Sequence, residues 1–318
     1  MKKDDKILVA GPRGLVGSAL VRRLEKEGYT NLLTPVREDL DLLGARAVSA
    51  WFHQNRPDHV FLAAARVGGI LANDTYPADF IRENLVIQNN VIHSAFTCNV
   101  KKLLFLGSSC IYPKHCPQPM KEEYLMTGPL EPTNSSYAMA KIAGIEMCWA
   151  YNRQHDTRFI PVMPTNLYGP NDNFDIETSH VLAALIRKFC DACRDNAESV
   201  TVWGTGTPRR EFLHVDDLAD ACCFLMQQTF SPEAYKNNPL YNIGTGTDIS
   251  IKELAGLIQN ITGFEGKITF DTTKPDGTPR KLLDVSRLQN LGWKPGITLE
   301  DGVRHTYDWY VNTRAYES

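Results

Sequence analysis

The 318-residue sequence contains no run of eighteen apolar residues, so it predicts no membrane-spanning helix. It also lacks an excess of basic residues, because 34 Lys and Arg stand against 37 Asp and Glu, which gives a net charge of −3. This balance argues against the positive field of a nucleic-acid-binding protein. The first six residues, Met-Lys-Lys-Asp-Asp-Lys, lack the apolar region of a signal peptide. We therefore expect a soluble cytoplasmic protein, long enough for more than one lobe.

The eight cysteines predict neither a disulfide framework nor a metal site. A cytoplasmic chain of this length rarely contains structural disulfides. Cys190-x-x-Cys193 has the spacing of half a zinc or redox site, but no second Cys-x-x-Cys and no nearby histidine pair accompany it. We interpret these two residues as neighbours on one face of a helix, and we expect no metal. Cys222 and Cys223 lie in an apolar run and are expected in the core.

The N-terminal segment has the pattern of a dinucleotide-binding unit. An apolar run at 7–10 precedes Gly11, Gly14 and Gly17, and residues 18–24 continue with helical spacing. Glycines let the backbone turn tightly and approach a pyrophosphate, which rests on the helix N-terminus. The spacing G-x-x-G-x-x-G is a variant of the common G-x-G-x-x-G. An ordinary glycine turn in an α/β unit is the alternative interpretation.

The charges after the second predicted strand bear on the choice of cofactor. NAD enzymes usually place an acid there for the ribose hydroxyls, whereas an arginine accommodates a 2′-phosphate. The first charged residue at this point is Arg37, twenty residues after Gly17, and Arg13 lies inside the glycine loop. We therefore predict NADP(H) rather than NAD(H). Glu38 and Asp39 follow directly, and a small shift in register would bring an acid into place.

Tyr137 and Lys141 are separated by four residues and share one face of a predicted helix. A nearby ammonium favours the phenolate, so we expect Lys141 to lower the pKa of Tyr137. Such a tyrosine can exchange a proton with a carbinol or ketone oxygen near neutral pH. The pattern Tyr-x-x-x-Lys alone arises often by chance, and an exposed helix face is the alternative.

Short apolar runs alternate with longer amphipathic ones in the first half of the chain. This alternation predicts an α/β fold with a Rossmann-type doubly wound parallel sheet. Ligands then bind at the carboxyl ends of the strands, where Gly107 and Ser109 fall. The predicted strands are 6–10, 31–34, 58–63, 101–107 and 158–163, and the predicted helices are 14–27, 44–55, 77–98 and 135–154.

The pattern changes after about residue 168, where loop residues become frequent. We divide the chain into an NADP-binding domain at 1–168 and a smaller α/β substrate-binding lobe at 169–318. Part of about 211–240 is expected to return to the first domain, with the strand at 211–215 and the helix after it rejoining its sheet. In the second lobe we predict helices at 179–192 and 250–262, strands at 201–204, 211–215 and 241–244, and a polar loop at 271–280.

Together these features resemble the extended short-chain dehydrogenase/reductase superfamily, with Ser108, Tyr137 and Lys141 as the catalytic set. Other segments resemble one particular family within this superfamily. Seven segments match, in order, the family of NADPH-dependent 3,5-epimerase/4-reductases that act on GDP-4-keto-6-deoxy-D-mannose. These segments are 65–70, 106–113, 131–134, 164–170, 179–181, 210–217 and 274–281.

The resemblance implies a multifunctional enzyme that makes GDP-L-fucose in two stages. A ketone at carbon 4 acidifies the protons on carbons 3 and 5, and the family assigns their exchange to residues that match Cys110 and His180. Thiols titrate near pH ~8.5 and imidazoles near ~6.5, so both can exchange protons at neutral pH. Hydride then reduces carbon 4, with Tyr137 as proton donor, Lys141 beside it and Ser108 on the carbonyl oxygen.

The resemblance also implies the binding residues and the assembly. Two long helices from each subunit, here 77–98 and 135–154, would form a four-helix bundle in a homodimer. Lys188 is a departure, because the family commonly has an arginine at this position. The expected GDP-sugar contacts are Lys188, Trp203, Arg210, Asp276 and Lys281. The expected cofactor contacts are Gly11, Arg13, Gly14, Leu15, Val16, Gly17, Arg37, Leu106, Gly107, Ser108, Ser109, Lys141, Pro164, Asn166, Leu167 and His180.

Two alternatives compete with this hypothesis. The first is another nucleotide-sugar 4-reductase, epimerase or dehydratase of the same superfamily. A dehydratase would need acidic residues beside Tyr137, where Ser136 and Ala138 stand instead. The second is a non-catalytic NADP-sensing regulator, but such proteins commonly lose the tyrosine or the lysine, and both are present here.

Overall fold

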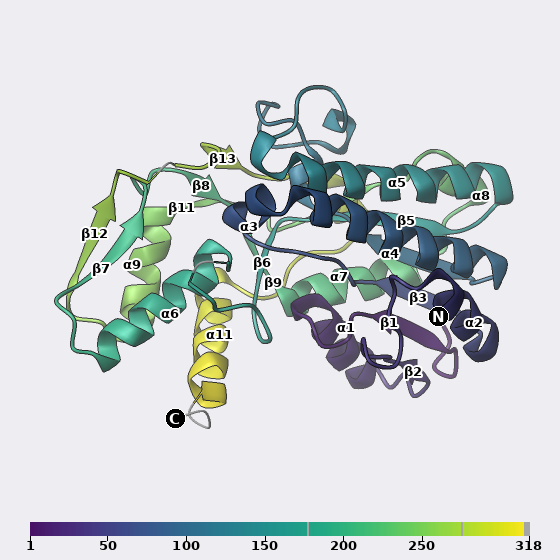
Figure 1. Cartoon of the computed structure of the whole chain (residues 1–318), viewed down its shortest axis with the longest axis horizontal. Coiled ribbons are helices and arrows are strands. Elements are labelled where there is room, and N and C mark those ends of the chain that lie inside the picture. The colour runs from purple at the N-terminus through teal and green to yellow at the C-terminus, as the bar shows by residue number, and fades with distance from the viewer. Residues whose placement is uncertain (177, 275, 315–318) are drawn as a thin grey trace.

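The computed structural model describes residues 1–176, 178–274 and 276–314. Pro275, which belongs to the predicted polar loop, lies outside these residues. The chain forms a larger lobe, at the right of Figure 1, and a smaller lobe at the left, from which the C-terminal helix descends. None of the described helices is both long enough and apolar enough to cross a membrane.

The larger lobe is built on a six-stranded parallel sheet in the order β10-β5-β4-β3-β1-β2. Strands β1, β3 and β5 are buried along their whole length, as expected when helices cover both faces of a parallel sheet. The six strands are β1 (Ile7–Ala10), β2 (Leu32–Leu33), β3 (His59–Leu62), β4 (Lys102–Leu106), β5 (Phe159–Pro164) and β10 (Tyr241–Ile243).

Two apolar cores lie on opposite faces of this sheet, because alternate residues of each strand enter different clusters. Leu8 packs with α2, α4 and α5, whereas Ile7 packs with α1 and α7. The predicted doubly wound α/β fold is confirmed. The covering helices are α1 (Leu15–Lys26), α2 (Ala45–Asn55), α4 (Pro77–Thr97), α5 (Ser135–His155) and α7 (Val215–Gln227).

The smaller lobe has a core of its own, in which Phe189, Leu254 and Val303 are buried. Its helices are α6 (Val181–Arg194), α9 (Ile251–Thr262) and α11 (Leu299–Arg314). Its strands are β7 (Ser199–Trp203) paired with β12 (Lys267–Asp271), and β8 (Arg209–Arg210) between β11 (Ile249–Ser250) and β13 (Arg280–Lys281).

The prediction that the strand at 211–215 rejoins the main sheet is wrong, whereas the helix after it, α7, does pack on that sheet. This segment forms β9 (Phe212–His214), which pairs with β6 (Asn166–Tyr168) in a separate two-stranded sheet. Only Thr165 separates the end of β5 from the start of β6, where the chain leaves the main sheet, and β9 pairs with β6 outside that sheet. The sixth strand of the main sheet is instead β10, which pairs with β5.

Several short elements complete the chain. Helix α3 (Ile70–Thr75) lies in a segment for which the sequence predicted no element. The others are α8 (Pro232–Lys236), α10 (Ser286–Asn290) and three 3₁₀ turns, η1 (Ser109–Ile111), η2 (Glu122–Tyr124) and η3 (Pro132–Asn134).

Candidate active site

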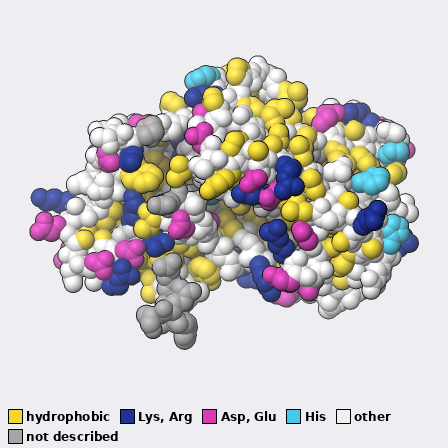
Figure 2. All heavy atoms as spheres, in the orientation of Figure 1, with side chains coloured by type: hydrophobic (Ala, Val, Ile, Leu, Met, Phe, Trp, Pro, Cys, Tyr) yellow, Lys and Arg dark blue, Asp and Glu magenta, His cyan; other side chains and the backbone are white. Residues whose placement is uncertain are grey.

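A cleft of about 1510 Å³ is lined by residues of both lobes. Every residue that the sequence indicated for the cofactor, the catalytic set or the GDP-sugar lines it. On the molecular face shown in Figure 2, acidic and basic side chains are interspersed, in keeping with the small net charge. No group of three or more His, Cys, Asp or Glu side chains suited to a metal ion occurs among the described residues.

The glycine loop forms one end of the cleft and leaves room for a dinucleotide. Gly11 has a positive φ of 84°, and a Cβ atom at Gly17 would lie 1.9 Å from the Gly11 carbonyl oxygen. Gly14 begins α1 without a side-chain cap, and the first turn carries no acidic residue. The first amide groups of a helix have no partner within the helix, so this end suits a pyrophosphate.

Two arginines line the cleft near the glycine loop. Arg13 forms an ion pair with Glu38 at 3.6 Å, in which both side chains are about three-quarters exposed. Within the described residues, Arg37 makes no ion pair. One guanidinium is therefore partly neutralised by the acid that follows the second strand, while the other is available to a phosphate.

The 3₁₀ turn after β4 brings Ser108 and Cys110 together. Ser108 begins η1, and its Oγ accepts a hydrogen bond of 3.4 Å from the Cys110 amide. Across the cleft, α5 supplies Tyr137 and Lys141. The Lys141 Nζ donates to the Leu106 carbonyl oxygen at 2.8 Å and lies 5.8 Å from the centroid of the Tyr137 ring. Strand β4 thus fixes both the serine and the lysine.

The expected lowering of the Tyr137 pKa is wrong for this structure. Burial raises the pKa of Tyr137 well above its ordinary value, Cys110 raises it further, and a hydrogen bond with Ser108 opposes the rise. The Lys141 ammonium is itself buried and is held by a backbone carbonyl. Burial lowers the pKa of Lys141 to about 8. At neutral pH the tyrosine is a neutral proton donor beside a cation.

Cys110 and His180 approach the same region from different lobes. Cys110 is buried, and burial raises its pKa, although the neighbouring Lys281 opposes this. His180 stands at the N-terminus of α6 and is exposed within the cleft. Desolvation by neighbouring protein atoms and the Lys281 charge lower the pKa of His180. The pair is therefore a neutral thiol and a neutral imidazole at pH 7.

The smaller lobe supplies cations and an exposed indole. Trp203 is 52% exposed, and the Lys188 Nζ lies 5.0 Å from its ring centroid while donating to the Thr201 carbonyl oxygen at 3.0 Å. Arg210 and Lys281 are partners in the parallel pairing of β8 and β13, and both line the cleft.

Asp276 has a partner within the protein that the sequence did not indicate. Its two carboxylate oxygens accept from the amide and hydroxyl of Thr205, at 2.9 and 2.6 Å. These bonds lower the pKa of Asp276 and hold the loop after β7 beside the cleft.

Glu211 is the residue that sequence reasoning missed. Its side chain is completely buried, and the oxygens accept backbone hydrogen bonds from Thr245, Gly246 and Leu283 at 2.7, 2.7 and 2.9 Å. Its carbonyl oxygen accepts from the Asn166 side chain at 2.7 Å. Glu211 therefore joins β6, β8, β13 and the loop after β10. Its place between Arg210 and an apolar run was the only signal in the sequence.

Comparison with known proteins agrees with this geometry. Residues 7–244 match the NAD dependent epimerase/dehydratase family. The chain is 60% identical to the putative GDP-L-fucose synthase 2 of Arabidopsis thaliana, over 98% of this chain and 93% of the relative. It is 53% identical to the GDP-L-fucose synthase of Escherichia coli (strain K12), over 97% of each.

Solved structures give the same result. A GDP-6-OMe-4-keto-L-xylo-heptose reductase from C. jejuni has a TM-score of 0.91 and 43% identity, over 98% of this chain and 99% of that one. A GDP-L-fucose synthetase from Naegleria fowleri has a TM-score of 0.91 and 29% identity, over 100% of this chain and 96% of that one. The chain therefore belongs to the NAD dependent epimerase/dehydratase family and, within it, to the GDP-L-fucose synthases.

Proposed function

We propose that this protein converts GDP-4-keto-6-deoxy-D-mannose into GDP-L-fucose, by epimerisation at carbons 3 and 5 and then NADPH-dependent reduction at carbon 4. One observation carries the proposal. A single cleft contains a Ser108–Tyr137–Lys141 reductase set together with a thiol and an imidazole at Cys110 and His180. A reductase alone would not need the last two groups.

Cys110 and His180 can perform the epimerisations without net consumption of protons. At each carbon, one group removes a proton from one face of the sugar and the other returns a proton to the opposite face. After an inversion, the group that acted as base carries the extra proton and the other group lacks one, so the pair holds the same number of protons. Both groups line the cleft, where exchange with solvent restores the starting state between the two inversions.

Tyr137 completes the reduction by donating its proton to the alkoxide that develops on the carbon 4 oxygen. Bound NADPH supplies the hydride. Ser108 holds the carbonyl oxygen, and its hydroxyl acts on Tyr137, since it lowers the pKa of that phenol. The Lys141 ammonium lies close enough to stabilise the tyrosinate that remains.

The residues around the glycine loop and the smaller lobe supply the binding contacts in this proposal. Arg13 and Arg37 suit the 2′-phosphate of NADP(H). Arg210 and Lys281 suit the diphosphate of the GDP-sugar, and Trp203 offers an exposed ring for stacking. We assign the larger lobe to the cofactor and the smaller lobe to the GDP-sugar.

We also propose that the protein is a cytoplasmic homodimer joined through α4 and α5. These helices pack side by side (Figure 1) and present exposed apolar side chains, including Leu85 and Met139. A chain with eight cysteines and no disulfide among them suits a reducing compartment.

The decisive experiment is to incubate the purified protein with GDP-4-keto-6-deoxy-D-mannose and NADPH in D₂O. We expect stoichiometric loss of NADPH absorbance, GDP-L-fucose as the product, and deuterium at carbons 3 and 5. Reduction to an unepimerised 6-deoxy sugar would identify a simple 4-reductase. An absence of NADPH oxidation would refute the proposal.

A further inference from the structure

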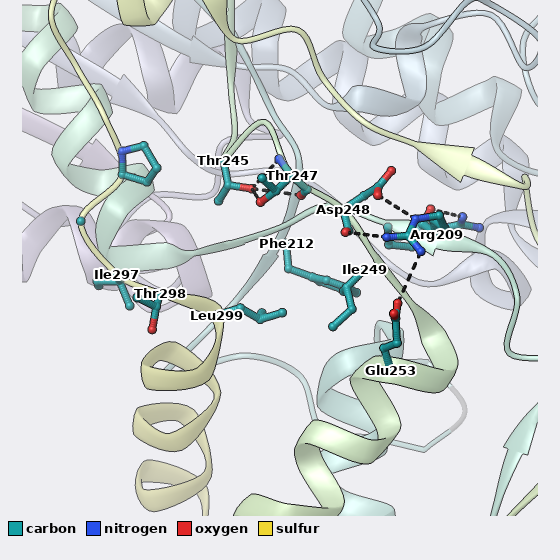
Figure 3. Close-up of a pocket in the computed structure, with 13 residues that line it drawn as sticks. Arg209, Phe212, Thr245, Thr247, Asp248, Ile249, Glu253, Ile297, Thr298 and Leu299 are labelled. Atoms are coloured by element: carbon teal, nitrogen blue, oxygen red, sulfur yellow. Dashed lines mark hydrogen bonds and ion pairs between the residues drawn. The ribbon is translucent and has the colours of Figure 1, made fainter.

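A second cavity, of about 650 Å³, lies behind the strand that carries Arg210. It is lined by Arg209, Asp248 and Glu253, by apolar side chains and by the start of α11. Figure 3 shows Arg209 pointing toward Asp248 and Glu253, with an ion pair to each. The guanidinium is thus occupied by protein carboxylates, so the cavity is not an anion site. The ion pairs along this cavity matter because they restrain β8, whose opposite face carries Arg210.

Two short strands place four cations next to one another. In the parallel pairing of β8 with β13, Arg209 is opposite Arg280, and Arg210 is opposite Lys281. Successive side chains of a strand point to opposite faces. Arg210 and Lys281 line the active-site cleft and Arg209 does not; Arg209 lines the second cavity, to which Arg210 also contributes. The strands therefore have a front pair of cations in the cleft and a back pair behind it.

The back pair is joined by one buried carboxylate. Asp248 accepts from the Arg209 Nε at 2.7 Å through one oxygen and from the Arg280 Nε through the other, and its side chain is 6% exposed. The Arg209 Nη2 also donates to the Asp248 carbonyl oxygen at 3.0 Å. Burial alone would raise the pKa of Asp248, but the two arginines lower it, so the carboxylate is charged at neutral pH.

The front pair has no such neutralising partner. Within the described ranges, neither Arg210 nor Lys281 forms an ion pair with a carboxylate. Burial and the neighbouring Arg210 charge lower the pKa of Lys281, while the charge of Glu131 opposes this and that of Asp276 acts on Arg210. Strands of two residues provide few backbone bonds to hold such a pair together. Side chains add to the restraint: Glu211 accepts from the Leu283 amide beyond β13, and the back pair of arginines makes a further contact.

We propose that Asp248 is a positioning residue for the substrate diphosphate. By clamping Arg209 and Arg280 behind the sheet, it fixes the register of β8 and β13, and with it the spacing of Arg210 and Lys281 one residue further along. Asp248 directly precedes β11, which pairs with β8 on its other side, so one carboxylate ties three strands together. This inference rests on the proposed role of Arg210 and Lys281 in GDP-sugar binding.

The test is Asp248→Asn in the full-length enzyme, because the amide keeps the shape but loses the charge. We expect KM for GDP-4-keto-6-deoxy-D-mannose, and Kd for GDP measured by calorimetry, to rise about tenfold, as misplaced binding groups do. The Kd for NADPH, measured by fluorescence, should not change. Glu253→Gln is the matched control: it removes the other, 59% exposed partner of Arg209 and should leave all three constants unchanged.

A double-mutant cycle separates positioning from general structural damage. In an Arg210→Gln/Lys281→Met background, Asp248→Asn should have no further effect on the Kd for GDP, because the groups that it positions are gone. If Asp248→Asn fails to fold, Arg280→Gln, at a 46% exposed side chain, should still raise the Kd for GDP in the same direction.

Several results would overturn the inference. They are an unchanged Kd for GDP in folded Asp248→Asn and Arg280→Gln, an equal loss of NADPH and GDP binding, or a full effect of Asp248→Asn in the double-variant background. Failure of the wild-type protein to turn over the keto sugar would instead refute the proposed function. The GDP measurements distinguish the two cases, because they need no turnover.

Discussion

Burial, more than nearby charge, determines the protonation of the central residues. From the sequence, Lys141 was expected to lower the pKa of Tyr137, because residues four apart on a helix are neighbours. In the structure the half-buried phenol lines the cleft, where desolvation raises its pKa, and the ammonium is held by the Leu106 carbonyl oxygen. A tyrosine that keeps its proton at neutral pH suits an acid, which is the role that a ketone reduction requires.

Tyr137→Phe tests this role at one atom. The change removes the hydroxyl and keeps the ring, so we expect kcat for reduction to fall about 10²–10⁴-fold while the Kd for NADPH stays constant. Deuterium exchange at carbons 3 and 5 should continue, because Cys110 and His180 are intact. A variant with wild-type kcat would show that another group donates the proton.

Cys110→Ser tests the epimerase half of the reaction. A hydroxyl has a far higher pKa than a thiol, so we expect deuterium incorporation from D₂O at carbons 3 and 5 to fall at least about 100-fold. Mass spectrometry of the recovered keto sugar measures this. Cys116→Ser changes a half-buried thiol outside the proposed machinery and is the control. Equal exchange in the two variants would contradict the role of Cys110.

The Lys141 pKa of about 8 predicts a pH dependence with opposite signs for activity and stability. Above pH 8 the ammonium loses its charge, so kcat/KM should fall about tenfold per pH unit. Between the folded pKa and the ordinary value of 10.5, the unfolded chain binds the proton more tightly, so this residue's contribution to stability rises with pH. Lys141→Arg, which stays charged, should lack the decline. Unfolding over the same pH range would contradict the explanation.

At the scale of elements, the spacing of apolar residues identified the helices and strands whose apolar pattern is uninterrupted along the chain. Strands β1 and β4 and helices α4 and α5 lie within a residue or so of their predicted bounds, because each combines apolar spacing with a clear turn signal. The pairing of β9 with β6 could not be predicted, since three-residue strands contain too little pattern to specify a partner. Helix α3 was not predicted, because its six residues follow Gly68 and Gly69, a pattern that indicates a loop.

Glu211 gives a stability prediction for the elements that it joins. In Glu211→Gln, one carboxylate oxygen becomes an amide that faces backbone donors, so at least one buried hydrogen bond is lost. We expect the free energy of unfolding to fall by about 1–3 kcal/mol. Urea denaturation measures the change, with the exposed Glu198→Gln as control. A destabilisation no larger than that of the control would show that the buried network is not needed for folding.

At the scale of the whole molecule, the sequence predicted which residues line the cleft but not what holds them there. The glycine loop and the Tyr-x-x-x-Lys helix have fixed spacings, so they can be located along the chain. Asp276, in contrast, bonds to Thr205, and Asp248 bonds to two arginines, through contacts between residues distant in sequence. Such contacts follow from the tertiary fold, and no local pattern signals them.

The proposed dimer gives a prediction for the assembly. Multi-angle light scattering should give a mass of about twice 35.7 kDa for the wild-type chain. Leu85→Glu combined with Met139→Glu places charge on side chains that are 36% and 49% exposed on α4 and α5, and it should give the mass of a monomer. Val311→Glu changes a similarly exposed apolar residue on α11 and should leave the dimer intact. A wild-type monomer would contradict the proposal.

The distribution of the thiols has a practical consequence. Burial raises the pKa of both thiols, but Cys110 is buried whereas Cys193 is exposed near the end of α6, the helix that His180 precedes. Thiol reagents react with accessible thiolates, so a maleimide dye should label Cys193 well before it reaches the reacting sulfur. The native sequence therefore provides an attachment point on the smaller lobe. A dye there would report movement of that lobe when a GDP-sugar enters, in a protein that still turns over its substrate.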